Sequence, residues 1–192
     1  TKRYFDKWVK ANPEKDTLYL NWLIELADIY RTTEDCINAS NYYKEAHALC
    51  TNLVFYNQFQ RFAKLNYLAR SIRKCDSLEL AIAYYKEAKT ALQQTDKNQT
   101  VTMAVLDVNI ANVYYANKEY DSSYTYYKYS EKLISELDDD EYLAYTTANL
   151  ALCYWAMDSI EQCKNYIAKS EQLYNKIDYG ESSTFQSVLE LK

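Results

Sequence analysis

The stretch AYYKEAKTAL at residues 83–92 recurs with changes at three other places in this chain of 192 residues. The other copies are NYYKEAHAL at 41–49, TYYKYSEKL at 125–133 and NYIAKSEQL at 165–173. Tyr85 has one small residue four positions before it, Ala81, and another three positions after it, Ala88. This spacing puts the three side chains on one helical face, where small residues let a neighbouring helix approach closely. Each copy is therefore predicted to be the second helix of a packed pair.

The copies keep a constant register along the chain. Their central large residues, spaced by 42, 42 and 40 positions, are Tyr43, Tyr85, Tyr127 and Ile167. Upstream of each copy, a large apolar residue and a small one are followed by a bulky residue three positions after the small one. These triplets are Leu26-Ala27-Tyr30, Leu68-Ala69-Ile72, Ile110-Ala111-Tyr114 and Leu150-Ala151-Tyr154. They predict the first helix of each pair.

Together the two patterns predict eight helices. First helices should run near residues 14–32, 55–74, 99–117 and 141–157, and second helices near 35–50, 77–94, 120–136 and 160–176. Asn12 followed by Pro13 indicates a helix start, with an asparagine cap and proline at the first helical position. Because the connections are short, consecutive helices should be antiparallel and adjacent.

The composition fits an all-α protein. One glycine and one proline beside 22 tyrosines leave few places for hairpin turns, whereas helices need neither residue inside them. No run of 18 apolar residues is present, so we expect no membrane contact by this segment. The net charge of −5 argues against direct nucleic-acid contact, which needs a concentrated face of Lys and Arg.

The cysteines are odd in number and form no C-x-x-C pair. The five are Cys36, Cys50, Cys75, Cys153 and Cys163. We interpret them as free thiols in helices rather than as a disulfide framework or a zinc site. Free thiols favour a reducing compartment such as the cytoplasm. The periplasm is the alternative if the parent protein carries a signal or an anchor.

The registered pattern resembles a tetratricopeptide repeat protein. Leu-small-x-x-Tyr on the first helix and small-x-x-x-Tyr-x-x-small on the second are similar to that family's signature, over about residues 16–177. The period of 40 to 42 exceeds the usual 34 residues and resembles the long-repeat branch found in bacterial regulators. HEAT repeats share this period, but the Tyr and small-residue register fits tetratricopeptide pairs better.

The resemblance implies an all-α, right-handed superhelical solenoid of antiparallel helix pairs. We expect residues 1–192 to be a single solenoid segment with about four repeats, at 14–50, 55–94, 99–136 and 141–176. The flanking stretches 3–10 and 182–192 look like partial helices. They carry apolar residues such as Trp8 and Phe185 where a solenoid end usually has a polar cap, so we expect the parent chain to continue.

Catalytic and metal chemistry are poorly represented, and we expect no enzyme activity and no cofactor. The one histidine, His47, is expected to be a partly exposed helix residue, and one glycine cannot build a phosphate loop. The acidic cluster of Glu136 and residues 138–141 could bind a cation. It also precedes a predicted first helix, where acids cap free N–H groups, and we prefer that interpretation.

The resemblance further implies a concave groove lined by first-helix residues. The groove positions carried over from the family are Asn21, Ile24, Asp28, Arg31, Asn66, Arg70, Arg73, Lys74, Val108, Asn112, Tyr115, Tyr145, Ala148, Leu152 and Trp155. Our candidate peptide-binding set is Asn66, Arg70, Arg73, Lys74, Asn112, Tyr115, Tyr145 and Trp155. The family's dicarboxylate clamp is not reproduced, because Ile24 and Asn66 stand where its first Lys is expected.

The candidate set suits an extended peptide of acidic character. Guanidinium groups bind carboxylates bidentately, Asn amides hold peptide backbone and aromatic rings provide buried area. Two alternatives remain open: Arg70 and Arg73 pair with acids such as Asp28 or Glu34, and Tyr115 and Trp155 pack between repeats.

The resulting functional hypothesis is a non-catalytic scaffold that binds a protein or peptide. It would serve as the sensory or interaction region of a bacterial transcriptional or two-component regulator. The alternative is a structural spacer, or a dimerisation solenoid that forms a homodimer through its apolar ends.

Overall fold

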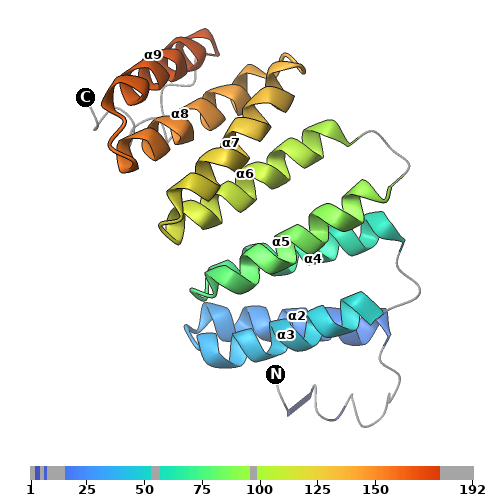
Figure 1. Ribbon diagram of the computed structural model, residues 1–192. Coiled ribbons are helices and arrows are strands. Elements are labelled where there is room, and N and C mark those ends of the chain that lie inside the picture. Colours follow the sequence, from blue (N-terminus) through green and yellow to red (C-terminus); the bar gives the residue numbers. More distant parts are fainter. Residues whose placement is uncertain (1–2, 5–6, 8–15, 53–56, 96–98, 178–192) are drawn as a thin grey trace. The chain divides into compact units, whose positions relative to one another are not determined.

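The computed structural model describes residues 3, 4, 7, 16–52, 57–95 and 99–177, and these residues contain helices and no strand (Figure 1). The long helices are α2 (Thr17–Thr32), α3 (Cys36–Asn52), α4 (Gln58–Arg73), α5 (Leu78–Gln93), α6 (Thr100–Ala116), α7 (Tyr120–Ser135), α8 (Asp140–Ala156) and α9 (Ile160–Lys176). Their ends lie within about three residues of the predicted ones. None of these helices is long and apolar enough to span a membrane.

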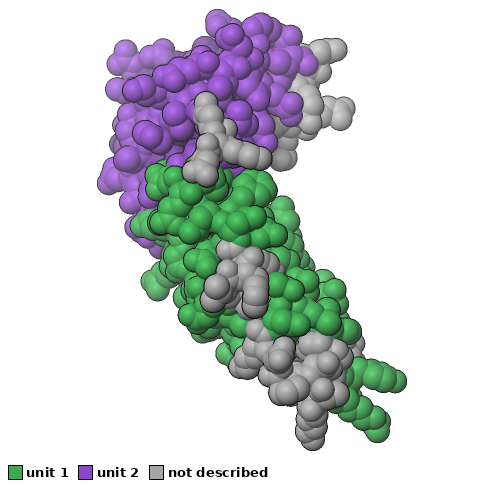
Figure 2. All heavy atoms as spheres, turned by 90° about the vertical axis from the view of Figure 1, so that its right-hand side faces the viewer, with its two compact units in different colours: residues 1–97 green, residues 98–192 purple. Residues whose placement is uncertain are grey.

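The chain divides into two compact units, residues 1–97 and residues 98–192 (Figure 2). In unit 1, α2 packs on α3, α3 on α4 and α4 on α5. In unit 2, α6 packs on α7, α7 on α8 and α8 on α9. Each unit therefore holds two helix pairs, that is, two repeats. A single solenoid over residues 1–192 remains a prediction.

The residues in register form the core of every pair. The rings of Tyr43, Tyr85 and Tyr127 are at most 1 % exposed. The flanking small positions are fully buried, whether they hold alanine or, in α7, Ser123 and Ser130. These two serines keep a close helix contact because their hydroxyls donate to the α6 carbonyl oxygens of Ala111 and Ala104, both at 2.9 Å. Serine can therefore replace alanine here without leaving a buried hydroxyl unsatisfied.

The turn inside each helix pair is also in register, although it contains no glycine. Glu34, Asp76, Lys118 and Asp158 have φ angles between 57° and 61°. Such left-handed residues close a helix end by directing the following N–H groups back to its last carbonyl oxygens. In repeat one, for example, the Asp35 N–H donates to the Tyr30 carbonyl oxygen at 2.9 Å. The sequence pattern did not reveal this conformation, because glycine is its usual signal.

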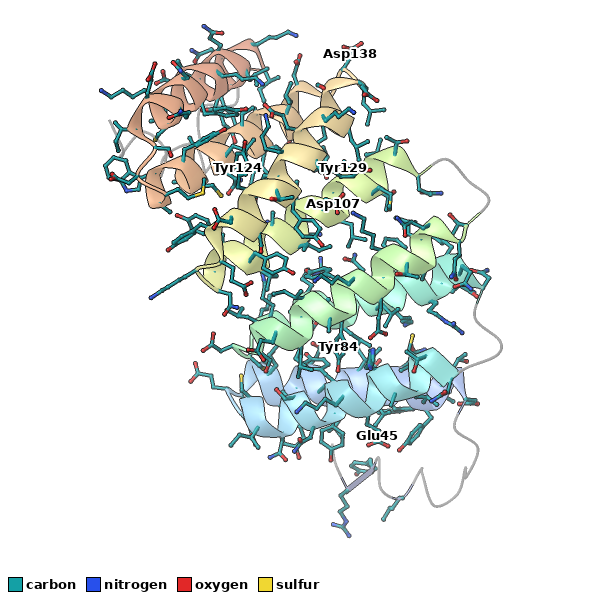
Figure 3. All side chains as sticks on the ribbon, in the orientation of Figure 1. Glu45, Tyr84, Asp107, Tyr124, Tyr129 and Asp138 are labelled. Carbon is teal, nitrogen blue, oxygen red and sulfur yellow. The ribbon has the colours of Figure 1, made fainter. Side chains whose placement is uncertain are left out.

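A polar link joins the two second helices of unit 1. The ring of His47 on α3 stacks on Tyr84 of α5, with centroids 3.9 Å apart, and its Nε2 lies 2.8 Å from Glu87 Oε2. Tyr84 is buried and projects from α5 in Figure 3. His47 itself is half-buried, as predicted from the sequence.

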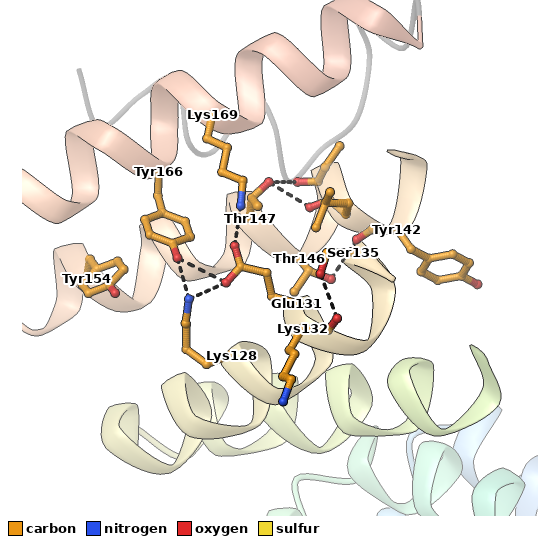
Figure 4. Close-up of polar contacts among 12 residues, drawn as sticks. Lys128, Glu131, Lys132, Ser135, Tyr142, Thr146, Thr147, Tyr154, Tyr166 and Lys169 are labelled. Carbon is orange, nitrogen blue, oxygen red and sulfur yellow. Dashed lines mark hydrogen bonds and ion pairs between the residues drawn. The ribbon is translucent and has the colours of Figure 1, made fainter. Parts of the chain in front are cut away.

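Unit 2 has the corresponding link with different chemistry (Figure 4). Glu131, 84 positions after His47, is 7 % exposed and accepts hydrogen bonds from Lys169 at 2.6 Å and Tyr166 at 3.2 Å. Lys128 donates to the same carboxylate at 2.5 Å and to the Tyr166 hydroxyl at 2.8 Å. Tyr166 and Lys169 occupy the repeat positions of Tyr84 and Glu87 in unit 1. The two links therefore join equivalent positions of successive second helices.

Several sequence predictions fall outside the described residues. These are the cap at Asn12 and Pro13, the segment 182–192 and, apart from residues 3, 4 and 7, the segment 3–10. Within the described part, α2 begins at Thr17, and the carboxylate of Asp16 caps it by accepting from the N–H groups of Leu18 and Tyr19 at 2.9 Å. The acidic cluster also caps a helix as predicted, because Asp139 Oδ1 accepts from the Tyr142 N–H at 3.1 Å.

Candidate functional site

Asp28 on α2 is the centre of a polar cluster in unit 1 whose members come from α2, α3 and α4. Its Oδ1 accepts from the Tyr43 hydroxyl at 2.6 Å and from Arg31 Nη2 at 3.2 Å. Its Oδ2 accepts from the hydroxyl of Tyr67, which belongs to α4. Burial and the bond to Asp28 raise the pKa of both tyrosines. The Asp28 carboxylate thus joins the first repeat to the second through Tyr67, and its charge is balanced by Arg31 of its own repeat.

Three basic residues at the C-terminal end of α4, Arg70, Arg73 and the C-cap Lys74, do not pair with the Asp28 carboxylate. Asp28 pairs with Arg31, and no ion pair joins Arg70, Arg73 or Lys74 to an acid in the part of the chain that the structure describes. The Arg70 guanidinium lies over the Tyr67 ring, 5.7 Å from its centroid. Arg70 and Lys74 are exposed and Arg73 is half-buried. We call these three residues the α4 basic patch.

Asn66 lies one helical turn before Arg70 on α4. Its side chain is half-buried, and its Oδ1 atom is buried without a hydrogen-bond partner among the described residues. A buried acceptor without a donor is costly, by about 1–3 kcal/mol.

In unit 2 the equivalent of Asp28 is Asn112, and the same local arrangement recurs. The Tyr127 hydroxyl donates to Asn112 Oδ1 at 2.5 Å, as Tyr43 donates to Asp28 in unit 1. Asn112 Nδ2 donates to the hydroxyl of Tyr145, on α8, at 3.3 Å. The structure therefore brings Asn112 and Tyr145 together across two repeats, and one Nδ2 hydrogen of the amide is left for another acceptor.

The aromatic members of the candidate set differ in exposure. Trp155, near the end of α8, is 47 % exposed. Tyr115 is half-buried and lies against the Tyr120 ring, with centroids 5.3 Å apart. Tyr115 also packs on the core cluster between α6 and α8. The alternative that Tyr115 serves packing is thus supported, whereas the Trp155 ring keeps a large accessible surface. We call Asn112, Tyr145 and Trp155 the α6/α8 patch.

Three positions carried over to the groove are wrong as ligand contacts. Ile24, Val108 and Ala148 are 8 %, 4 % and 0 % exposed. Val108 packs with Tyr127 and Leu150 in one core cluster of unit 2. Aliphatic residues at this position fill the space between neighbouring first helices, so they leave no surface for a peptide.

Sequence reasoning also missed two contributors. Tyr67 was not among the groove positions, yet it contacts both Asp28 and Arg70. Tyr43 was predicted only as a core ring, whereas its hydroxyl reaches the Asp28 carboxylate. A signal was present, because a polar residue stands fifteen positions before the tyrosine in both pairs, Asp28 with Tyr43 and Asn112 with Tyr127. Among the described residues, no group of three or more His, Cys, Asp and Glu side chains could hold a metal ion.

No protein-family model and no curated protein matches the sequence. Solved structures do match. The TPR-like repeats of a kinesin light chain from Podosopora anserina share 14 % identity over 90 % of this chain and 82 % of that one, with a TM-score of 0.71. The apo form of RapI gives a TM-score of 0.81 at 11 % identity, over 98 % of this chain and 51 % of that chain.

A signal-transduction ATPase from Pyrococcus horikoshii with a tetratricopeptide repeat sensor is similar as well. Its TM-score is 0.68 at 15 % identity, over 97 % of this chain and 28 % of that one. Identities this low report on the fold rather than on ligands. The chain has a tetratricopeptide-like fold of antiparallel helix pairs, as the sequence register predicted.

Proposed function

We propose that this chain is a scaffold that binds a protein or peptide through the exposed faces of its first helices. The α4 basic patch carries the proposal, because its three cations have no ion-pair partner among the described residues although the carboxylate of Asp28 lies on the preceding first helix. Cations without an acidic partner in the protein are available to a ligand that carries carboxylates. An extended peptide of acidic character fits this patch.

Unit 2 supports the same function with another chemistry. The amide of Asn112 suits a backbone carbonyl oxygen, and the exposed ring of Trp155 offers apolar contact area. Aromatic residues and arginine are the side chains that most often dominate binding energy in protein interfaces. We therefore include the α6/α8 patch as a second contact surface for a polypeptide.

The finer proposal is that the scaffold is the sensory or interaction region of a bacterial regulator. Support comes from RapI and from the sensor of the signal-transduction ATPase, with which the chain shares its fold. A spacer or dimerisation role is the competing proposal, and a concentration-dependent dimer in light scattering would favour it.

The test is a peptide-array screen of the chain, with acidic peptides and their Asn- and Gln-substituted counterparts. We expect acidic peptides to bind, and Arg70→Glu with Arg73→Glu to abolish that binding. The control is Lys44→Glu with Lys164→Glu, which changes the net charge equally at two exposed positions of second helices. Loss of binding in both double variants, or retention in the first, would refute the assignment to the α4 patch.

A further inference from the structure

The large core residue of each second helix is matched by the residue fifteen positions before it on the first helix. In repeat one the Tyr43 hydroxyl donates to Asp28 Oδ1 at 2.6 Å, and in repeat three the Tyr127 hydroxyl donates to Asn112 Oδ1. In repeat four both positions are apolar and pack together. Each of these three pairs is therefore chemically complete within its own repeat.

Repeat two is the exception, because Arg70 stands fifteen positions before Tyr85. Arg73 follows one turn later and is the repeat equivalent of Arg31, whose Nε donates to the Tyr43 hydroxyl at 3.2 Å. A guanidinium group has donors and no acceptor, so neither arginine can take the proton of the Tyr85 hydroxyl. In the described part of the chain this hydroxyl makes no hydrogen bond, although the residue is only 1 % exposed. The site thus has donors only.

The fold brings these three donors to one place. Residues three apart on a helix are neighbours on its surface, and α4, which carries both arginines, packs on α5, which carries Tyr85. The ring of Tyr67 lies under the Arg70 guanidinium, 5.7 Å from centroid to Cζ. Burial raises the pKa of Tyr85, although the charges of Arg73 and Arg70 oppose that rise. The last turn of α4 accommodates both cations, because a helix C-terminus carries partial negative charge.

We infer that Arg70, Arg73 and the Tyr85 hydroxyl bind the phosphoryl group of a phosphorylated side chain in a bound polypeptide. This inference rests on the proposed function and names the ligand group that the α4 basic patch accepts. The ligand supplies the acceptor that Asp28 supplies in repeat one. Two guanidinium charges favour a phosphate monoester, which carries about −1.5 to −2 at pH 7 and three acceptor oxygens, over a singly charged carboxylate.

The first test compares N-acetyl-phosphoserine amide with N-acetyl-glutamate amide as probes of the full chain. Binding is followed by the backbone amide shifts of α4 and α5 in NMR titrations at constant ionic strength. At pH 7 we expect the phosphoserine probe to bind about tenfold more tightly. At pH 5 the phosphate monoester is mostly a monoanion, because its second pKa is about 6, and the preference should fall to about twofold. Equal affinities at pH 7, or a preference that is the same at both pH values, would overturn the inference.

The second test removes the hydroxyl alone, with Tyr85→Phe. We expect this variant to bind the phosphoserine probe about threefold more weakly or less, while its unfolding temperature stays close to that of the wild type, because the hydroxyl has no hydrogen bond to lose. The control is Tyr154→Phe in unit 2, which removes a hydroxyl that donates to Tyr124 and should leave the affinity unchanged. Unchanged affinity in Tyr85→Phe would contradict the site. If this variant does not fold, the pH dependence in the wild type still decides.

Free phosphate shares the chemistry of a phosphorylated side chain, and the peptide array separates the two sources. Replacing one acid of each bound peptide by phosphoserine should strengthen binding, and inorganic phosphate should compete only at much higher concentration. Inorganic phosphate that binds as tightly as the phosphopeptides would overturn the assignment to a polypeptide. Acidic peptides that bind through the arginines without any gain from phosphoserine would overturn the inference and leave the proposed function intact. Failure of the proposed function differs, because peptides then stay bound after Arg70→Glu with Arg73→Glu.

Discussion

Replacing Glu131 with glutamine should weaken unit 2 more than any exposed charge change does. The substitution keeps the size of the side chain and removes one buried negative charge that faces Lys128 and Lys169 (Figure 4). A hydrogen bond to a charged group contributes about 1.5–3 kcal/mol. The two ammonium groups are roughly 40 % exposed and regain water when the carboxylate is lost. We therefore expect a loss of about 2 kcal/mol, below the 3–5 kcal/mol typical of a fully buried broken pair.

The loss should depend on pH. Burial raises the pKa of Glu131, but the hydrogen bonds from Lys128 and Lys169 outweigh it and hold the pKa below the ordinary value of 4.5. A carboxyl with a lowered pKa in the folded state contributes its stability above the unfolded-state pKa. That stability disappears as the pH falls through the lower folded-state value. The difference between wild type and variant should thus be full at pH 7 and shrink below about pH 4.5.

The assay is urea unfolding followed by circular dichroism at pH 7 and at pH 3. Glu136→Gln, at the exposed end of α7, is the matched control and should change stability by less than about 0.5 kcal/mol. Exchanging the charges, with Glu131→Lys and Lys169→Glu together, should recover part of the loss. An equal loss at both pH values, or a loss no larger than that of the control, would show that the link contributes nothing specific.

Two further predictions concern unit 1. Ala88→Leu should lower the free energy of unfolding by about 1–3 kcal/mol or more, because the small residue at this fully buried position lets two helices approach closely. Ala83→Leu, on the exposed face of α5, is the control and should be nearly neutral in thermal unfolding. Burial and Glu87 raise the pKa of Tyr84 to about 12, so its stabilising effect is complete below pH 10 and is lost as the pH rises toward 12. The drop in the unfolding midpoint between pH 9 and pH 11 should therefore be smaller for Tyr84→Phe than for wild type.

The helices were predictable because their signal is repeated. Tyr43, Tyr85 and Tyr127 each stand between two small residues, and four registered copies leave little doubt about which face is buried. Helix ends followed from the same register within a few residues. The left-handed turn residues were not predictable as a class, since Glu34 and Lys118 have no special turn propensity and Asp, which tolerates this conformation, stands in only two of the four turns.

The candidate site was only partly predictable, because its polar contacts come from neighbouring repeats. The position of Asp28 on the first-helix face followed from the register. The contact of Asp28 with Tyr67 could not be predicted in this way, since the pattern of a single repeat contains no information about a side chain that comes from the next helix pair. Val108 was wrongly predicted to line the groove. The same repeat position is accessible when its residue is polar, but an aliphatic residue there packs into the core.

The two links between second helices have a consequence for assembly order. Their positions are equivalent, yet His47 faces Glu87 in unit 1 whereas Glu131 faces Lys169 in unit 2. A misassembled or domain-swapped chain that stacked repeat three directly before repeat two would oppose the carboxylates of Glu131 and Glu87. Repeat one placed before repeat four would oppose His47 and Lys169. Because the two links differ in chemistry, they disfavour pairing of the wrong repeats, although the repeat cores are nearly interchangeable.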